Sequence, residues 1–225
     1  MGRAKIPRKS TTIDMTAMCD VAFLLLSFFI LATKQKPPEA VTVAAPNSVS
    51  SKAAPEKSFL VTLTKEGKCF LMLGDDTKKT EILKDINTTR GLGLSDGEIA
   101  KLKKLPFIGM PLGQIKGILA LNQTIPPDKY PGIPIGDSTN NELNDWVFSI
   151  KNAYAGTDQK DLEEKILIKG DQEAFYPAFK NIKQALKRND IYKFRIVTNV
   201  ESAPIGSELY NNNKLGVTAT GEKKQ

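Results

Sequence analysis

The residue with the most unusual chemical setting in this chain is Asp20, an acidic side chain at the start of an apolar stretch. From Val21 to Ala32 no residue is charged, and only Ser27 is polar. Placing an ionised carboxylate inside a membrane-spanning helix costs about 2.5–3.5 kcal/mol on insertion scales. We therefore expect Asp20 to face protein or water and not lipid.

Residues 13–33 are long and apolar enough to predict a single transmembrane helix. On a helix, the spacing places Thr16, Asp20 and Ser27 on one stripe together with Lys34. One helix cannot shield such a stripe, so the pattern implies a helical partner. The alternative is that Asp20 lies at the membrane surface, near the N-terminal end of the helix, where acidic residues are favourable. The opposite face is apolar and suits lipid or a partner helix; it carries Ala22, Leu25, Phe28 and Phe29.

Composition excludes several classes of function. The 225 residues suffice for one anchor and one ordinary domain. The formal charge of +7 is spread along the chain without clustered aromatic residues, so nucleic-acid binding is not expected. The absence of histidine removes the commonest general base and metal ligand. We predict no enzyme activity, no cofactor and no metal site, and no disulfide between Cys19 and Cys69.

Charged residues around the apolar stretch predict its orientation. Arg3, Lys5, Arg8 and Lys9 precede it, which favours a cytoplasmic segment 1–12 and a chain that continues across the membrane after Lys34. A cleaved signal peptide is the alternative. It is disfavoured because Asp20 lies where the apolar region begins and no small-x-small site directly follows Ala32.

Residues 34–57 predict an extended, mobile linker, because they hold four prolines and few large apolar residues. Only Val41-Thr42-Val43 alternates, before Pro46, and this segment could add as a strand to another chain. The plain linker is the other interpretation. Residues 58–74 then predict a β-hairpin around a turn at 65–68.

The remainder predicts a small α+β domain over residues 58–200, a sheet with helices on one face. Within 75–157, a capping box at Ser95 and Glu98 predicts a short helix, 112–121 has weak helical spacing, and 124–139 reads as loop. A helix follows at 141–155. Residues 165–169 and 192–197 predict parallel strands joined by a helix at 173–188. That helix should point Phe175, Phe179, Ile182, Ala185 and Leu186 inward. Residues 201–225 predict a flexible tail.

The stretch Ile13-Asp-Met-Thr16-Ala-Met18-Cys-Asp20-Val21 continues into Leu24-Leu25 and resembles the anchor signature of the ExbD/TolR biopolymer-transport family, with Ala17 in place of the usual proline. Val41-Thr-Val43-Ala-Ala-Pro46 is similar to the linker motif of that family. Ile166–Asp171, Tyr176 and Phe194–Thr198 resemble its folded core. The resemblance covers residues 6–74 and 160–200, and residues 75–157 look like an insertion, largely of helix and loop.

The resemblance implies an ExbD-like subunit of a proton-driven motor in the bacterial inner membrane, single-pass, with its C-terminal domain in the periplasm. Asp20 would carry protons, with Thr16 and Ser27 as neighbours, inside a ring of an ExbB/TolQ-like polytopic protein. Val41, Thr42, Val43 and Pro46 would bind a partner chain. The motor would act on a TonB/TolA-like protein that spans the periplasm, and the subunit would form a homodimer.

Two alternatives stay open at this stage. The first is a TolR-like subunit of the Tol-Pal system, which binds peptidoglycan and maintains envelope integrity. The second is a membrane-anchored periplasmic enzyme or receptor in which Asp20 is incidental.

Overall fold

The computed structural model describes residues 15–32, 41–49, 54–55, 57–121, 126–136, 140–157, 159–202, 204–206 and 210. The chain forms two compact units, Met1–Pro38 and Glu39–Gln225, which we treat separately. The predicted cytoplasmic segment 1–12 and most of the predicted tail 201–225 lie outside the described residues.

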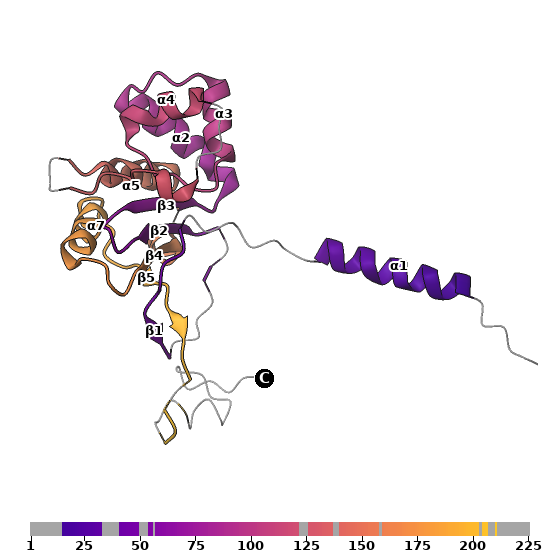
Figure 1. The fold of residues 1–225 in the computed structure, drawn as a ribbon. Helices are drawn as coiled ribbons and strands as arrows, with labels where there is room; N and C mark the ends of the chain where they lie inside the picture. Colours follow the sequence, from indigo (N-terminus) through magenta and orange to yellow (C-terminus); the bar gives the residue numbers. More distant parts are fainter. Residues whose placement is uncertain are drawn as a thin grey trace, which may run out of the picture. The chain divides into compact units, whose positions relative to one another are not determined.

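The first unit contains the helix α1, Met15–Ala32 (Figure 1). It confirms the predicted helix 13–33 to within two residues at each end. Its 18 residues extend about 27 Å at 1.5 Å per residue, close to the thickness of a bilayer core. By length and composition it is the one helix among the described residues that could cross a membrane.

The second unit is built on a four-stranded sheet in the order β3-β2-β4-β5. Strands β2 (Phe59–Leu63) and β3 (Cys69–Leu73) form the predicted antiparallel hairpin, with Phe59 opposite Leu73. Its turn uses Gly67 at φ +81°, where a side chain would be strained. Strand β4 (Ile166–Gly170) runs parallel to β2, and β5 (Arg195–Ile196) runs parallel to β4. The predicted parallel pairing is confirmed, although β5 is much shorter than the predicted strand 192–197.

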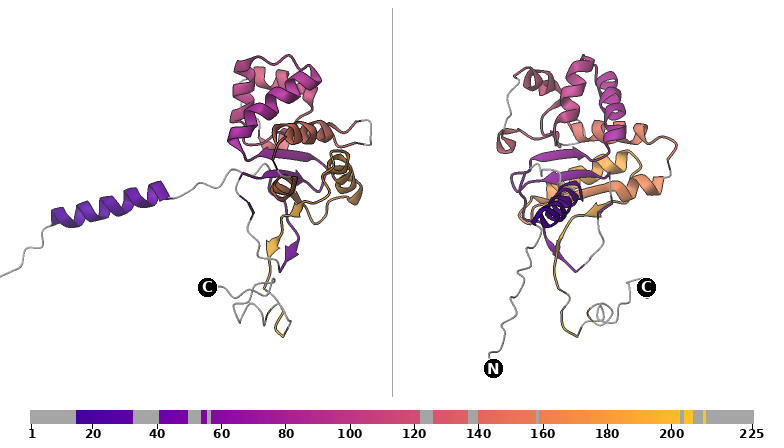
Figure 2. Two further views of the ribbon diagram at one scale, coloured as in Figure 1. Left: turned by 180° about the vertical axis from the view of Figure 1, so that it is seen from behind. Right: turned by 90° about the vertical axis from the view of Figure 1, so that its right-hand side faces the viewer.

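Helices pack against this sheet (Figures 1 and 2). Figures 1 and 2 show α2, α3 and α4 gathered beyond the β3 edge of the sheet. The capping box of Ser95 and Glu98 is present at the start of α3, as predicted. The helices are α2 Asp76–Arg90, α3 Asp96–Lys104, α4 Ile115–Ala120, α5 Glu142–Ala153, α6 Gln159–Lys165 and α7 Tyr176–Arg188, with short 3-10 turns at Leu112–Gln114 and Pro127–Lys129.

Residues 75–157 belong to the same hydrophobic core as the sheet. Ile82 and Leu83 of α2 are fully buried, and so are Leu143 and Trp146 of α5, the helix predicted at 141–155. All four lie in one cluster with Phe59 of the hairpin. The segment is therefore an integral part of the folded unit and not a separate appendage.

The outer side of β3 is occupied by the same segment. Leu71 and Ile108 exchange two backbone hydrogen bonds, of 2.8 and 2.7 Å. The backbone N–H of Ile133 donates to the Cys69 carbonyl at 2.8 Å. Residues from two loops thus cover the backbone groups that an edge strand would otherwise expose.

The prediction that Phe175 points inward is wrong. Phe175 is 69% exposed, because α7 begins at Tyr176 and Phe175 takes the extended N-cap conformation, with φ −65° and ψ 124°. Pro177 lies in the first turn of α7, as expected. Ile182, Ala185 and Leu186 are buried as predicted, and Phe179 packs edge-on against Phe194.

Candidate functional site

Asp20 is the one charged residue of α1, and its side chain is exposed. No side chain of α1 is buried, and large apolar residues such as Phe23 (69% exposed) and Leu31 (85% exposed) have no protein cover within their own unit. A helix that is apolar all round requires lipid or a protein partner. Asp20 therefore lies on a helix whose surroundings must be supplied from outside the helix itself.

Thr16, Asp20 and Ser27 lie on one face of α1. A regular helix turns about 100° per residue, which places the three within about 40° of one another around the axis. The Ser27 hydroxyl donates to the Leu24 carbonyl at 2.9 Å, so its proton is used within the helix while its oxygen can still accept. The three side chains thus share the face that the sequence spacing predicts. Their role in carrying protons stays a prediction.

The segment 41–46 is the second predicted site, and it belongs to the folded unit. Its side chains alternate: Val43 and Ala45 are 8% and 2% exposed, whereas Thr42 and Ala44 are exposed. This is the two-residue period of an extended strand with one covered face.

Two residues that follow β4 hold this segment. The Ala44 N–H donates to the Asp171 carboxylate at 3.0 Å, and the Gln172 N–H donates to the Ala44 carbonyl at 3.0 Å. The Gln172 side chain also donates to the Ala45 carbonyl at 3.0 Å. The backbone N–H groups of Glu173 and Ala44 lower the pKa of Asp171. The carboxylate therefore stays charged and able to accept both hydrogen bonds near neutral pH.

Asn199 holds the other end of the segment. Its side chain donates to the Ala45 carbonyl at 2.8 Å, and its N–H donates to the Pro46 carbonyl at 2.9 Å. Strand β1 (Asn47–Ser48) then pairs in parallel with β6 (Asn199–Val200). The prediction of a mobile linker over 34–57 is thus wrong for residues 41–49. The rest of that range, apart from 54–55 and 57, lies outside the described residues.

An open groove of about 670 Å³ runs beside this segment. Val41, Val43 and Phe70 supply apolar lining, and Lys65, Lys68, Glu66 and Asp128 supply charged or polar lining. The Lys68 ammonium donates to the Asp128 carbonyl at 3.3 Å. The size and the mixed lining are typical of a site for a peptide segment or a small polar molecule.

Sequence reasoning missed Asp171, Gln172 and Asn199 as residues that hold the segment. Asp171 and Gln172 lie 127 residues from the groups they bind, and Asn199 lies 154 residues away. A usable signal was the Gly170-Asp171 pair directly after a strand, because Asp often hydrogen-bonds backbone N–H groups at such turns.

The described residues contain no group of three or more His, Cys, Asp or Glu side chains placed to hold a metal ion. Cys69 is fully buried, and burial raises the pKa of its thiol to about 12, which makes it unreactive.

Residues 7–103 match the family model described as biopolymer transport protein ExbD/TolR. The match supports assignment of the chain to the ExbD/TolR family. It spans α1, the segment 41–49, the hairpin, α2 and most of α3, so it continues into the predicted insertion 75–157. Comparisons with curated proteins and with solved structures found no match.

The match to the ExbD/TolR family model supports a role related to biopolymer transport. Proteins of this family are transport-associated and not enzymes, and they generally work with ExbB/TolQ-like and TonB/TolA-like partners. The apolar helix α1 is consistent with their single-pass attachment to the inner membrane.

Proposed function

We propose that this chain is an ExbD-like subunit of an inner-membrane, proton-driven motor that energises TonB-dependent transport across the outer membrane. Asp20 is the proton carrier in this proposal. The observation that carries it is one carboxylate on an otherwise uncharged apolar helix, on the same face as Thr16 and Ser27. Acidic residues inside a membrane span usually mark a functional site, and proton relays are one of the uses of such sites.

The mechanism follows from the two states of the carboxyl group. When charged, Asp20 favours polar groups of a surrounding ExbB/TolQ-like ring; when protonated, it can pass apolar surroundings. Because the two states prefer different packings, each proton taken up and released shifts the helix against the ring. A proton that crosses 100 mV supplies about 2.3 kcal/mol. Thr16 and Ser27 are hydrogen-bonding neighbours along the same face.

The proposed orientation places residues 1–12 in the cytoplasm and the folded unit in the periplasm, because four basic residues precede α1. The folded unit then faces the TonB-like protein on which the motor acts, and it pairs with a second copy.

Val41, Thr42, Val43 and Pro46 form the proposed partner-binding segment. Asp171, Gln172 and Asn199 bind one side of this extended backbone. Val43 lines the groove together with Phe70, and its backbone N–H and C=O form no hydrogen bond with another described residue. These free groups support addition of a strand from the energised partner or from a second subunit.

The decisive experiment measures proton flux. The chain is co-purified with its ExbB-like partner, reconstituted into vesicles and compared with Asp20→Asn. We expect Asp20→Asn to insert and to bind the partner but to abolish flux, whereas Asp20→Glu keeps part of the flux because it keeps a titratable group. Leu25→Ala, on the opposite face of α1, is the control, because it leaves Thr16, Asp20 and Ser27 unchanged. Full flux in Asp20→Asn would refute the proton-carrier role.

A TolR-like subunit of the Tol-Pal system is the alternative, since the matched family model includes both ExbD and TolR. Deletion of the gene separates the two. Loss of iron-carrier or vitamin uptake supports the ExbD-like role. A leaky envelope with normal uptake, together with binding of purified peptidoglycan by the folded unit, supports the TolR-like role.

A further inference from the structure

The outward face of α7 carries a straight stripe of four exposed residues. Tyr176, Lys180, Lys183 and Lys187 follow one another at intervals of four, three and four residues, which places them within about 60° around the helix axis. The opposite face holds the buried residues Ile182, Ala185 and Leu186. The lysines of the stripe are therefore fixed on the solvent side by the packing of the rest of the helix.

The charge of this stripe is not balanced locally. Helix α7 has four basic residues, the three lysines and Arg188, and no acidic residue. Among the described residues, none of the three lysines forms an ion pair with a carboxylate. Like charges three and four residues apart destabilise a helix. An anionic partner would relieve this repulsion.

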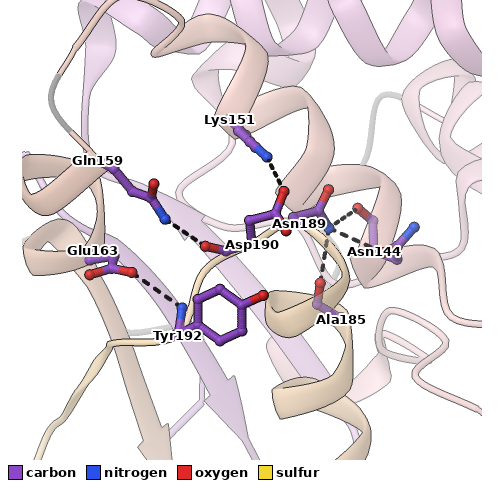
Figure 3. Close-up of polar contacts among 8 residues, drawn as sticks. All are labelled: Asn144, Lys151, Gln159, Glu163, Ala185, Asn189, Asp190 and Tyr192. Carbon is purple, nitrogen blue, oxygen red and sulfur yellow. Dashed lines mark hydrogen bonds and ion pairs between the residues drawn. The ribbon is translucent and has the colours of Figure 1, made fainter.

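Hydrogen bonds hold α7 in place at its C-terminal end. The side chain of Asn189, 5% exposed, donates to the Ala185 carbonyl at 2.9 Å and to the Asn144 side chain of α5 at 3.1 Å (Figure 3). The next residue, Asp190, accepts a hydrogen bond from Lys151 at 2.8 Å. The stripe is thus a pre-formed surface, whose ordering costs little when a partner binds.

We propose that this stripe, the α7 stripe, docks on an anionic membrane surface through lipid phosphate groups. Charge complementarity is the first argument. The second argument is that two exposed aromatic side chains lie at one end of the stripe, Phe175 (69% exposed) and Tyr176 (68% exposed). Aromatic side chains favour the headgroup level of a bilayer.

The third argument is the short tether. Eight residues, 33–40, separate the last residue of α1 from Val41, and a chain of that length spans at most about 30 Å. The bilayer that holds α1 is therefore always within reach of the folded unit. This tether raises the effective concentration of lipid headgroups at the folded unit. The inference rests in this respect on the proposed membrane anchoring by α1.

The test uses the full chain in nanodiscs of zwitterionic phosphatidylcholine, or with about one third anionic phosphatidylglycerol. A fluorophore at Gln184→Cys, beside the stripe, reports contact with a quencher attached to the lipid headgroups. Cys19→Ser removes the exposed native thiol, and Thr89→Cys on α2 provides a second labelling site. We expect quenching at Gln184→Cys in anionic discs at low salt only, and little quenching at Thr89→Cys.

Neutralising the stripe with Lys180→Gln, Lys183→Gln and Lys187→Gln should lower the ratio of docked to free domain on the order of 100-fold, at roughly five-fold per lysine. The matched control is Lys84→Gln, Lys104→Gln and Lys129→Gln, which removes the same charge elsewhere and should leave quenching unchanged. Equal quenching in both kinds of disc, or an equal loss in the control, would overturn the proposal.

Two further outcomes are distinguishable. Binding of intact cell-wall sacculi that depends on the three lysines, without a response to anionic lipid, would reassign the stripe to the cell wall and overturn docking on the membrane. Alkaline extraction of the same samples reports on α1. A chain that is extracted refutes the proposed anchoring and this inference with it, whereas an inserted chain without quenching refutes the stripe alone.

Discussion

The hydroxyl of Tyr154 donates a 2.5 Å hydrogen bond to the carboxylate of Asp75, 79 residues earlier in the chain. Asp75 also caps α2, because its other carboxylate oxygen accepts from the backbone N–H of Thr77 at 3.1 Å. Tyr154 follows the last residue of α5. One buried carboxylate thus joins the two ends of the segment 75–157.

Tyr154→Phe should destabilise the folded unit by about 1–3 kcal/mol, because a buried charged acceptor loses its donor. The ring remains in place, so the edge-on contact with Phe59 at 5.6 Å is kept and the hydroxyl alone is tested. Chemical denaturation of the full chain in detergent measures the effect. Tyr192→Phe, at an exposed position, is the control. If both variants are equally stable, the hydrogen bond contributes nothing.

Acid should weaken this same contact. Burial alone would raise the pKa of Asp75, but hydrogen bonds from Thr77 and Tyr154 outweigh it and lower the pKa to about 2. A lowered folded-state pKa stabilises the protein above the unfolded value, near 3.9, and the contribution is lost as the pH falls towards 2. The difference in stability between the native chain and Tyr154→Phe should therefore be constant above about pH 5 and shrink below pH 4. A difference that grows in acid would contradict this assignment.

Gly74 ends the hairpin where no side chain fits. A Cβ at this position would lie 2.3 Å from the backbone oxygen of Ser58, with which the Gly74 N–H forms a 3.0 Å hydrogen bond. Gly74→Ala should cost about 1–3 kcal/mol, since the backbone must move. Gly97→Ala, in α3 with open space around it, should be neutral or stabilising by up to about 1 kcal/mol. Thermal unfolding of both variants provides the comparison, and equal melting temperatures would show that the backbone adjusts freely.

Asp171→Ala should release the segment 41–49 from the folded unit. The variant loses the acceptor for the Ala44 N–H, although Gln172 and Asn199 keep their bonds to Ala45 and Pro46. We expect faster hydrogen exchange at Ala44 and smaller changes near Asn47. Asp190→Ala removes an exposed carboxylate elsewhere and serves as the control. Because the pKa of Asp171 is lowered, the protection of the Ala44 N–H, relative to its slower intrinsic exchange in acid, should fall in the native chain only after acidification. Unchanged exchange at Ala44 would show that Asp171 does not hold the segment.

Local patterns predicted the elements whose signal lies within a few residues. The hairpin at 58–74 has alternating apolar residues around a glycine turn, and α5 carries its apolar residues on one face. The anchor helix and the position of Asp20 in it could also be predicted, because length and apolarity are local properties of the sequence.

Helix α2 escaped prediction because its sequence is mostly polar and its buried residues are few: Lys79, Ile82, Leu83 and Ile86. Its caps, Asp75 and Gly91, were the available signals. The docking of 41–49 could not be predicted from composition, because its hydrogen-bond partners are more than 120 residues away. Phe175 was misassigned since α7 starts three residues later than its periodicity indicates.

The loops that bind the outer side of β3 have a consequence for assembly. Among the described residues no strand pairs with the outer side of β5, so with Ile108 and Ile133 in place an incoming strand would join the main sheet there. Two copies that met there would each turn a blocked side outward, so growth by sheet extension would stop at a closed pair instead of running on into a fibre.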